Sequence, residues 1–178
     1  MRRMPSVAIL LLAAGCGPAS TPITPSSAVA EAPLWIYSQS TDEMNGSKTV
    51  SAAIESTDTF AGHYDSDQEH TTLRIIRHGK STEVAIVNPN LQFTCSAYTG
   101  TYVQVKFDDG PASRFRCVDE STDKYGVAFI TNEATFIKRL KSAHGFIIGA
   151  DVFQRGEQRM HFTNPGLTWP PTSKELGG

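Results

Sequence analysis

Hydrophobic and polar residues alternate along much of the chain between residues 34 and 163. A period of two is typical of β-strands that bury one face and expose the other. The clearest two stretches, 72–75 and 83–86, lie on either side of Gly79-Lys80. Because the first position of a tight two-residue turn needs a positive φ, which glycine adopts readily, this segment predicts a β-hairpin.

The same alternation predicts a series of further short strands separated by residues that favour turns. Their approximate ranges are 34–39, 48–56, 91–95, 102–107, 114–117, 125–130, 146–153 and 158–163.

Apolar side chains take up a helical spacing after residue 132. The stripe consists of Phe136, Ile137, Leu140 and Ala143. Asn132 is suited to cap the start of this helix, and Gly145 is suited to end it. About nine or ten short strands with this one late helix predict a mainly β fold, either an antiparallel β-sandwich or a half-open barrel with one late α-helix.

The first residues do not belong to this pattern. MRRMPSVAILLLAAGCG has two arginines, a short apolar run and small residues before Cys16. A membrane-spanning helix needs about 20 apolar residues, so this shorter run is typical of a secretory signal. The segment 12–16, Leu-Ala-Ala-Gly-Cys, resembles the lipobox of bacterial lipoproteins. That resemblance implies cleavage before Cys16 and a lipid on its thiol; the alternative is an ordinary signal peptide with Cys16 incidental.

Composition then divides the chain into four parts. The segment before residue 33 is rich in Pro, Ser, Thr and Ala, which suits a semi-extended tether, and the end of the chain also lacks core residues. We therefore expect a lipoprotein signal peptide at 1–15, a lipidated cysteine and flexible linker at 16–32, a β-rich globular domain at 33–169 and a disordered tail at 170–178.

Net charge restricts the partners. Removal of residues 1–15 takes away two of the 16 basic residues, which leaves 14 against 18 acidic ones and a net charge of −4. This balance does not favour nucleic acid. The lipoprotein resemblance implies a membrane anchor in the bacterial cell envelope, and Gly17 after the cysteine favours the periplasmic face of the outer membrane.

Two cysteines remain if Cys16 carries a lipid. Because secreted proteins keep disulfides, we expect Cys95 and Cys117 to pair. Each shares the register of apolar neighbours, Phe93 and Phe115, so both thiols should point into the core. The alternative, a catalytic or metal-bound thiolate pair, would need a polar and electropositive pocket.

Asp108-Asp109-Gly110-Pro111 separates two of the predicted strands. Aspartates accept local backbone hydrogen bonds, glycine supplies a positive φ and proline ends strand pairing, so turn chemistry explains all four residues. A carboxylate pair for acid–base catalysis would have to lie in a cleft with shifted pKa values. We therefore favour the turn.

The segment 63–70 is the most metal-like stretch of the chain. Its carboxylates are spaced as the first positions of a calcium loop, but His70 and Ile76 stand where glycine and glutamate are required. We favour a solvated acidic loop and predict no metal and no cofactor. The alternative is a metal site drawn from His63, Asp65, Asp67 and His70.

Other catalytic motifs do not fit. Gly79-Lys80-Ser81 resembles the end of a phosphate-binding loop, but Arg74 stands where that motif requires its first glycine. No hydrolase, zinc-protease or cysteine-nucleophile signature is found in the sequence. We therefore predict that the protein is not an enzyme.

Basic residues alternate outward on the strands at 102–107 and 114–117. They are Lys106, Arg114 and Arg116, with Tyr102 on the same face. A basic strip beside an aromatic ring suits an acidic partner or a cell-wall polymer. The alternative is a charged sheet face that only resists edge pairing.

The order of short motifs resembles small proteobacterial periplasmic proteins, mostly of unknown function, which include the type VI secretion-associated accessory proteins VasI and TagO. The matching residues are Trp35, Ser38, Asp42, Leu73, Arg77, Lys106, Asp108, Phe136, Leu140, Phe162, Gly166 and Leu167. The resemblance implies an envelope module without catalysis.

These observations favour a lipid-anchored periplasmic binding or interaction module. It would serve an envelope or secretion machine, or act as an immunity or exclusion lipoprotein, with an envelope protein or cell-wall component as partner. The alternative is a small envelope hydrolase or metal-dependent enzyme that uses the 63–70 loop.

The lipid anchor leads to a direct prediction. Cys16→Ala removes the thiol that would carry the lipid, so the variant should be released from membranes while the parent stays in the membrane fraction. Fractionation with immunoblotting measures this, and an alanine variant that remains tightly anchored would contradict lipidation at Cys16.

Overall fold

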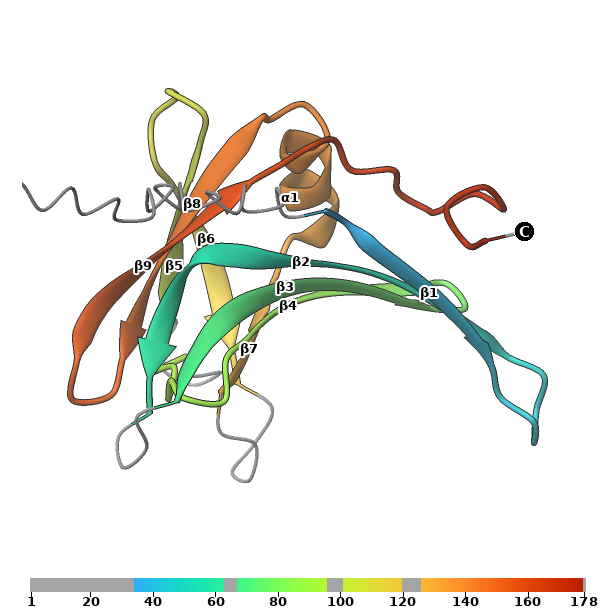
Figure 1. The fold of residues 1–178 in the computed structure, drawn as a ribbon, viewed down its shortest axis with the longest axis horizontal. Helices are drawn as coiled ribbons and strands as arrows, with labels where there is room; N and C mark the ends of the chain where they lie inside the picture. The colour runs from blue at the N-terminus through green and yellow to red at the C-terminus, as the bar shows by residue number, and fades with distance from the viewer. Residues whose placement is uncertain (1–33, 63–66, 96–100, 120–125, 178) are drawn as a thin grey trace, which may run out of the picture. The chain divides into compact units, whose positions relative to one another are not determined.

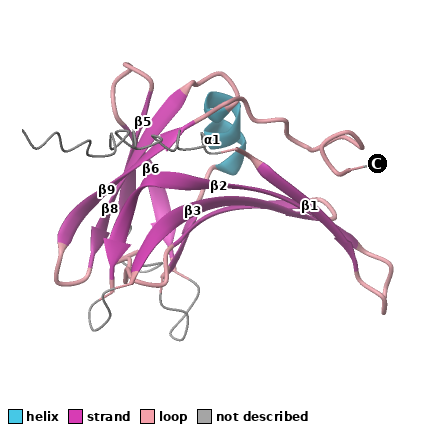
Figure 2. Ribbon diagram, viewed as in Figure 1, coloured by secondary structure: helices cyan, strands magenta, loops and turns pink. Residues whose placement is uncertain are grey.

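The computed structural model describes residues 34–62, 67–95, 101–119 and 126–177. Strands dominate these residues, and one helix lies late in the chain (Figures 1 and 2). The elements are β1 (Ile36–Thr41), β2 (Lys48–Ala61), β3 (Gln68–His78), β4 (Ser81–Val87), β5 (Tyr102–Phe107), β6 (Ser113–Val118), β7 (Val127–Ile130), α1 (Glu133–Leu140), β8 (Gly145–Val152) and β9 (Gly156–Thr163).

The strands form one antiparallel sheet in the order β1-β2-β3-β4-β7-β6-β5-β8-β9. Hairpins join β1 to β2, β2 to β3, β3 to β4 and β8 to β9. Between them the chain leaves β4, makes the β5–β6 pair and returns through β7 to the edge of β4. The predicted mainly β, antiparallel fold with one late helix is confirmed.

The sheet curls until β2 and β9 lie side by side, but it does not close. The register of β2 shifts between Glu55 and Thr59, which is a bulge that bends the strand. From this bulge Thr57 Oγ1 donates to the His161 carbonyl of β9 at 3.2 Å, and Asp58 Oδ2 accepts the His161 N–H at 2.6 Å. Side chains rather than a backbone ladder hold this seam, so the fold is a half-open barrel.

Alternate side chains fill the interior of the curl. Val103 and Val105 of β5 have no exposed surface. The alternating residues Tyr102 and Gln104 point to solvent. An aromatic cluster lies where α1 meets the sheet: Phe136 packs edge-on against Phe107 and Phe115, with ring centroids 5.6 and 5.3 Å apart. Such pairs contribute about 0.5–1.5 kcal/mol beyond the burial of their area.

The buried side chain of Asn164 joins three distant parts of the domain. Its Nδ2 donates to the carbonyls of Leu140 and Ala143, each at 2.7 Å, just where α1 ends. Its Oδ1 accepts the indole N–H of Trp35 at 2.8 Å. The last carbonyls of a helix have no partner within it. The amide supplies a partner for the Leu140 carbonyl at the helix end, beside the Ala143 N–H, and for the Ala143 carbonyl in the turn that follows, and it also fixes the entry to β1.

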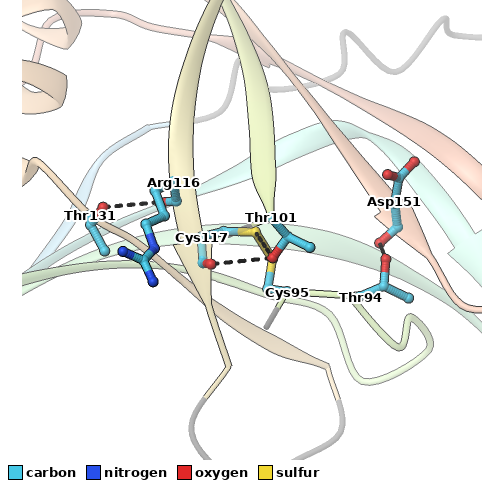
Figure 3. Close-up of a disulfide and its surroundings, with 7 residues drawn as sticks. All are labelled: Thr94, Cys95, Thr101, Arg116, Cys117, Thr131 and Asp151. Carbon is cyan, nitrogen blue, oxygen red and sulfur yellow. Dashed lines mark hydrogen bonds between the residues drawn. A yellow bond between two sulfur atoms is a disulfide. The ribbon is translucent and has the colours of Figure 1, made fainter. Parts of the chain in front are cut away.

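Cys95 and Cys117 form a disulfide in the structure, with both residues buried and their Cα atoms 5.3 Å apart (Figure 3). The segment 91–95 was expected to be a strand, and that prediction is wrong. It makes only an isolated bridge between Phe93 and Val152, flanked by a hydrogen bond from the Thr94 N–H to the Asp151 carbonyl at 2.8 Å. The cysteine is thus held by a short extended segment against the end of β8.

Asn132 stands at the N-cap position of α1 as predicted, although not with the expected side-chain cap, and the predicted C-terminal end of the helix is wrong. Asn132 adopts a left-handed conformation with φ 64°, and its side chain makes no capping hydrogen bond; its carbonyl accepts the Phe136 N–H instead. The backbone of Asn132 therefore turns the chain from β7 into α1. At the other end α1 stops at Leu140, and Gly145 begins β8.

The segment expected to be a disordered tail has a local structure in its described part, residues 170–177. Trp169 just before it is buried, and Glu175 accepts hydrogen bonds from the N–H and the hydroxyl of Thr172. Trp169 is thus a core residue, and Thr172 and Glu175 contact each other beyond it. The expected signal peptide and linker lie outside the described residues.

Asn164→Ala should lower the free energy of unfolding by about 3–5 kcal/mol, because it leaves the buried Trp35 indole N–H and Ala143 carbonyl without partners and removes one of the two donors to the Leu140 carbonyl. Urea denaturation monitored by tryptophan fluorescence measures the change. Asn45→Ala in the exposed turn between β1 and β2 is the matched control and should cost about 1 kcal/mol or less. Equal losses in the two variants would show that Asn164 has no special weight.

Candidate functional site

The candidate partner-binding residues lie together on the outer face of β6, β5, β8 and β9. Strand register places Tyr102 directly opposite Arg116 and Gln104 directly opposite Arg114. Gln104 lies in turn opposite Gly149 of β8, which lies opposite Arg159 of β9. A continuous row of outward positions therefore crosses four strands.

We call the set Tyr102, Lys106, Arg114 and Arg116 the basic face. Tyr102 is 51% exposed, both arginines are exposed and Lys106 is half-buried. The carbonyl of Arg116 accepts hydrogen bonds from the N–H and the hydroxyl of Thr131, the residue that follows β7 (Figure 3). These bonds fix the backbone at the Arg116 end of the basic face. The predicted clustering of these four residues is thus present in the geometry, and their function is a separate question.

Glu157 and Arg159 of β9 extend this face and were not among the residues singled out from the sequence. Arg159 Nε lies 3.0 Å from Glu157 Oε1, and Gln104 Nε2 donates to Glu157 Oε2 at 3.2 Å. Glu157 is therefore matched by Arg159 and Gln104. In the part of the chain that the structure describes, Lys106 and Arg114 have no such carboxylate partner, which leaves the face positive.

A shallow hollow of about 270 Å³ lies on this face between β5, β8 and β9. It is lined by Gln104, Lys106, Ala112, Ile147, Gly149, Glu157 and Arg159. A Cβ added at Gly149 would lie 3.5 Å from the Glu157 side chain, so the glycine leaves space in the hollow. Because Arg159 already pairs with Glu157, Lys106 beside the apolar Ile147 is the cation left to meet a carboxylate on a short apolar stem.

The side chain of Asp108, in the β5–β6 turn, has a structural role. Its Oδ1 accepts the N–H groups of His144 and Gly145 at 2.8 and 2.9 Å, and its own N–H donates to the Gly145 carbonyl at 2.9 Å. The hydrogen bonds from Gly145 and His144 hold the pKa of Asp108 below its ordinary value. The carboxylate therefore fastens the turn to the start of β8.

Asp108-Asp109-Gly110-Pro111 forms a turn as expected, but the residue with positive φ is Asp108 and not the expected Gly110. Asp108 has φ 45°, and Gly110 is not in the left-handed region. A short polar side chain tolerates this conformation better than most others, and here it also aims the carboxylate at β8. At the other predicted tight turn Gly79 has φ 57°, as its sequence predicts.

The described part of the 63–70 segment, residues 67–70, does not meet the Asp108-Asp109 turn. Ala61 and Gln68, which flank the β2–β3 connection, lie at one end of the curled sheet, and the β5–β6 turn lies at the other (Figure 1). His63 and Asp65 are outside the described residues. Within the described ranges, no group of three or more His, Cys, Asp or Glu side chains is placed to hold a metal ion, and His70 Nδ1 lies 3.1 Å from the Asp58 carbonyl.

A histidine–carboxylate pair at the β2–β9 seam was missed in the sequence. Asp58 Oδ2 lies 2.9 Å from His161 Nδ1 and also accepts the His161 backbone N–H. Both side chains are partly exposed. No sequence signal links two residues 103 positions apart, and their contact depends on how far the sheet curls.

No family model matches this chain, and neither a curated protein nor a solved structure matches it significantly. Among the described residues, no helix has both the length and the apolar character needed to cross a membrane. Cys16 lies outside the described residues.

The lowered pKa of Asp108 predicts a pH-dependent contribution to stability. A group whose pKa is lower in the folded than in the unfolded state stabilises the fold above its unfolded pKa, about 3.9, and loses this effect as pH falls through the folded value. Asp108→Asn keeps an oxygen acceptor but loses the charge. It should therefore be less stable than the parent at neutral pH, with a difference that shrinks in acid.

Urea midpoints measured from about pH 7 down to about pH 2.5 test this prediction. Asp109→Asn, one residue along in the same turn, is the matched control and should follow the parent at each pH. A constant offset between Asp108→Asn and the parent over the whole range would mean that the charge of Asp108 contributes nothing.

Proposed function

We propose that this protein is a lipid-anchored interaction module of the bacterial cell envelope, which binds a carboxylate-bearing partner through the basic face. One observation carries the proposal: Lys106 lines the Gly149 hollow, Arg114 lies directly opposite Gln104 of that lining, and neither cation has a carboxylate partner among the described residues. Unmatched cations on and beside a partly apolar hollow favour an acidic group from another molecule.

The size of the hollow favours a partner side chain over a cofactor. Small-molecule sites usually measure about 300–1,000 Å³ and enclose most of their ligand. A shallow hollow of about 270 Å³ is closer to the pockets that receive single anchoring side chains in protein interfaces. An exposed tyrosine, Tyr102, lies on the same face, and tyrosine is enriched in such interfaces.

The N-terminal lipobox supports the location. A Pro-rich linker at about 3.1 Å per residue would hold the domain on the order of 45 Å from the lipid surface. At that distance the basic face would meet envelope proteins or cell-wall polymer. Two uses suit such a module: an accessory of an envelope or secretion machine, and an immunity or exclusion lipoprotein that captures an incoming protein.

The test is the double charge reversal Lys106→Glu with Arg114→Glu in the full lipidated chain. Partners co-purified from membranes are quantified by mass spectrometry, and the reversal should reduce the specific partner at least about tenfold, because like charges then face each other across the interface. Binding by the parent should also weaken as salt rises.

Arg74→Glu with Lys80→Glu is the matched control, since it changes the net charge equally at exposed positions on β3 and its hairpin turn. The control should keep the partner. A partner set that survives reversal of the basic face, or that is lost equally in both double variants, would remove the basic face as the binding surface. A parallel assay with purified cell wall distinguishes a polymer from a protein partner.

A further inference from the structure

The Gly149 hollow contains charges of both signs. Lys106 and Glu157 both line it, and the proposed function uses only the cation. A site for a simple anion gains nothing from a carboxylate in its lining, because like charges brought together weaken binding. The position of Glu157 in the hollow therefore points to a ligand that carries a positive charge as well as a negative one.

The carboxylate of Glu157 is held in place and still has room for another donor. Arg159 Nε lies 3.0 Å from its Oε1, and Gln104 Nε2 donates to its Oε2 at 3.2 Å. A carboxylate offers about four lone-pair sites, so these two contacts leave a site on each oxygen. The Glu157 side chain is 36% exposed. A ligand ammonium can therefore reach a carboxylate whose direction is already fixed.

The anion and the nearest unmatched cation are spaced for one small head group. Gln104 and Lys106 lie two residues apart on the outer face of β5, which is about 7 Å along a strand. The Gln104 amide marks the position of the Glu157 carboxylate, because the two are hydrogen-bonded. Two charge-assisted hydrogen bonds of about 2.8 Å each, one on either side of a small head, cover a gap of this size.

Apolar surface lies next to the cation. Ile147 of β8 is directly opposite Lys106 and is half-buried, so part of its side chain faces the hollow. Ala112, in the β5–β6 turn, is exposed and lines the same hollow. A hydrocarbon stem that continues from the head group would cover these two side chains.

We propose that the hollow binds the zwitterionic head of an α-amino acid, with its ammonium on Glu157, its carboxylate on Lys106 and an apolar stem along Ile147. This inference rests on the proposed function and names the ligand class of the same site. Residues within a protein chain, and those at its two ends, do not carry both charges on one α-carbon. The ligand is therefore a free amino acid or an amino acid attached through its side chain, such as the diamino acid of a cell-wall stem peptide.

Three small compounds with the same stem test the two charges separately. Norleucine carries both charges, hexanoate lacks the ammonium and pentylamine lacks the carboxylate. Each is titrated into the full chain in detergent, and the Gly149 backbone amide is followed by nuclear magnetic resonance. Norleucine should have a dissociation constant at least about tenfold lower than either of the others, because it pairs both Glu157 and Lys106. Equal dissociation constants for norleucine and hexanoate overturn the inference.

Glu157→Gln tests the carboxylate with little change in shape. Norleucine should bind at least about tenfold more weakly to this variant, whereas hexanoate should bind at least as tightly as to the parent, because a repelling charge has gone. Glu43→Gln removes the same charge at an exposed position in the β1–β2 turn and should bind all three compounds like the parent. A Glu157→Gln variant that keeps the parent's preference for norleucine overturns the inference.

Failure of this inference can be separated from failure of the proposed function. If hexanoate binds as tightly as norleucine, the hollow is a carboxylate site and only the zwitterionic ligand is wrong. If none of the three compounds shifts the Gly149 amide while reversal of Lys106 and Arg114 still removes the partner, the inference fails and the proposed function stands. A partner that survives that reversal overturns the proposed function.

Cell-wall fragments distinguish the two sources of such a head. One stem peptide carries its diamino acid with the far ammonium and carboxylate free, and the other carries the same carboxylate as an amide. Tighter binding of the free form than of norleucine assigns the ligand to the cell wall, and equal binding of the two assigns it to the amino acid alone. An amidated fragment that binds as tightly as the free one contradicts recognition of a zwitterion.

Discussion

The hydrogen bonds of the Asn164 amide join the two ends of the described domain to the end of its helix. This one side chain meets the indole of Trp35 before the first strand, the Leu140 carbonyl at the end of α1 and the Ala143 carbonyl just after it, and it does so from the segment that follows the last strand. The Thr168 N–H, which donates to the Tyr37 hydroxyl, adds a second link between the same two segments. Because the polar atoms of these Asn164 contacts are buried, they have no water to replace the amide, and the arrangement is fixed by the cost of leaving them unpaired. This closure acts together with the bulge in β2 and the contacts of Thr57 and Asp58 with His161, which bend the sheet and hold β2 beside β9.

Once the sheet is curled, its alternation assigns the inner positions to the core and the outer positions to the surface. On β5 the valines at 103 and 105 are wholly buried, so Gln104 between them must point outward, where it lies in one row with Arg114 and Arg159. The charged residues of this face differ in their partners. Arg159 forms an ion pair with Glu157, whereas Lys106 and Arg114 have no carboxylate partner within the described residues.

Local patterns predict what depends on local physics, and they predict little else. The period of two identified most strands. The pairing of Cys95 and Cys117 followed from their being the two cysteines left if Cys16 carries a lipid, and their apolar register predicted that both point into the core. The exact role of Asp108 was not accessible, because its partners His144 and Gly145 lie on another strand, 36 and 37 residues away. The seam between Asp58 and His161 and the contact of Trp35 with Asn164 span 103 and 129 residues, and no spacing rule reaches so far. Several residues that carry the resemblance to periplasmic proteins, among them Trp35, Phe136 and Leu167, are buried, so a core of this kind accounts for them without any shared function.

The central claim is that partners meet this protein on its basic face. Site-specific photo-crosslinking in living cells tests it most directly, with p-benzoylphenylalanine in place of Tyr102 on that face and in place of Lys80 on the distant β3–β4 turn. The account predicts a discrete adduct from position 102 to an acidic envelope component, lost when Lys106 and Arg114 are reversed, and no adduct from position 80. Adducts from position 80 with none from position 102 would contradict it.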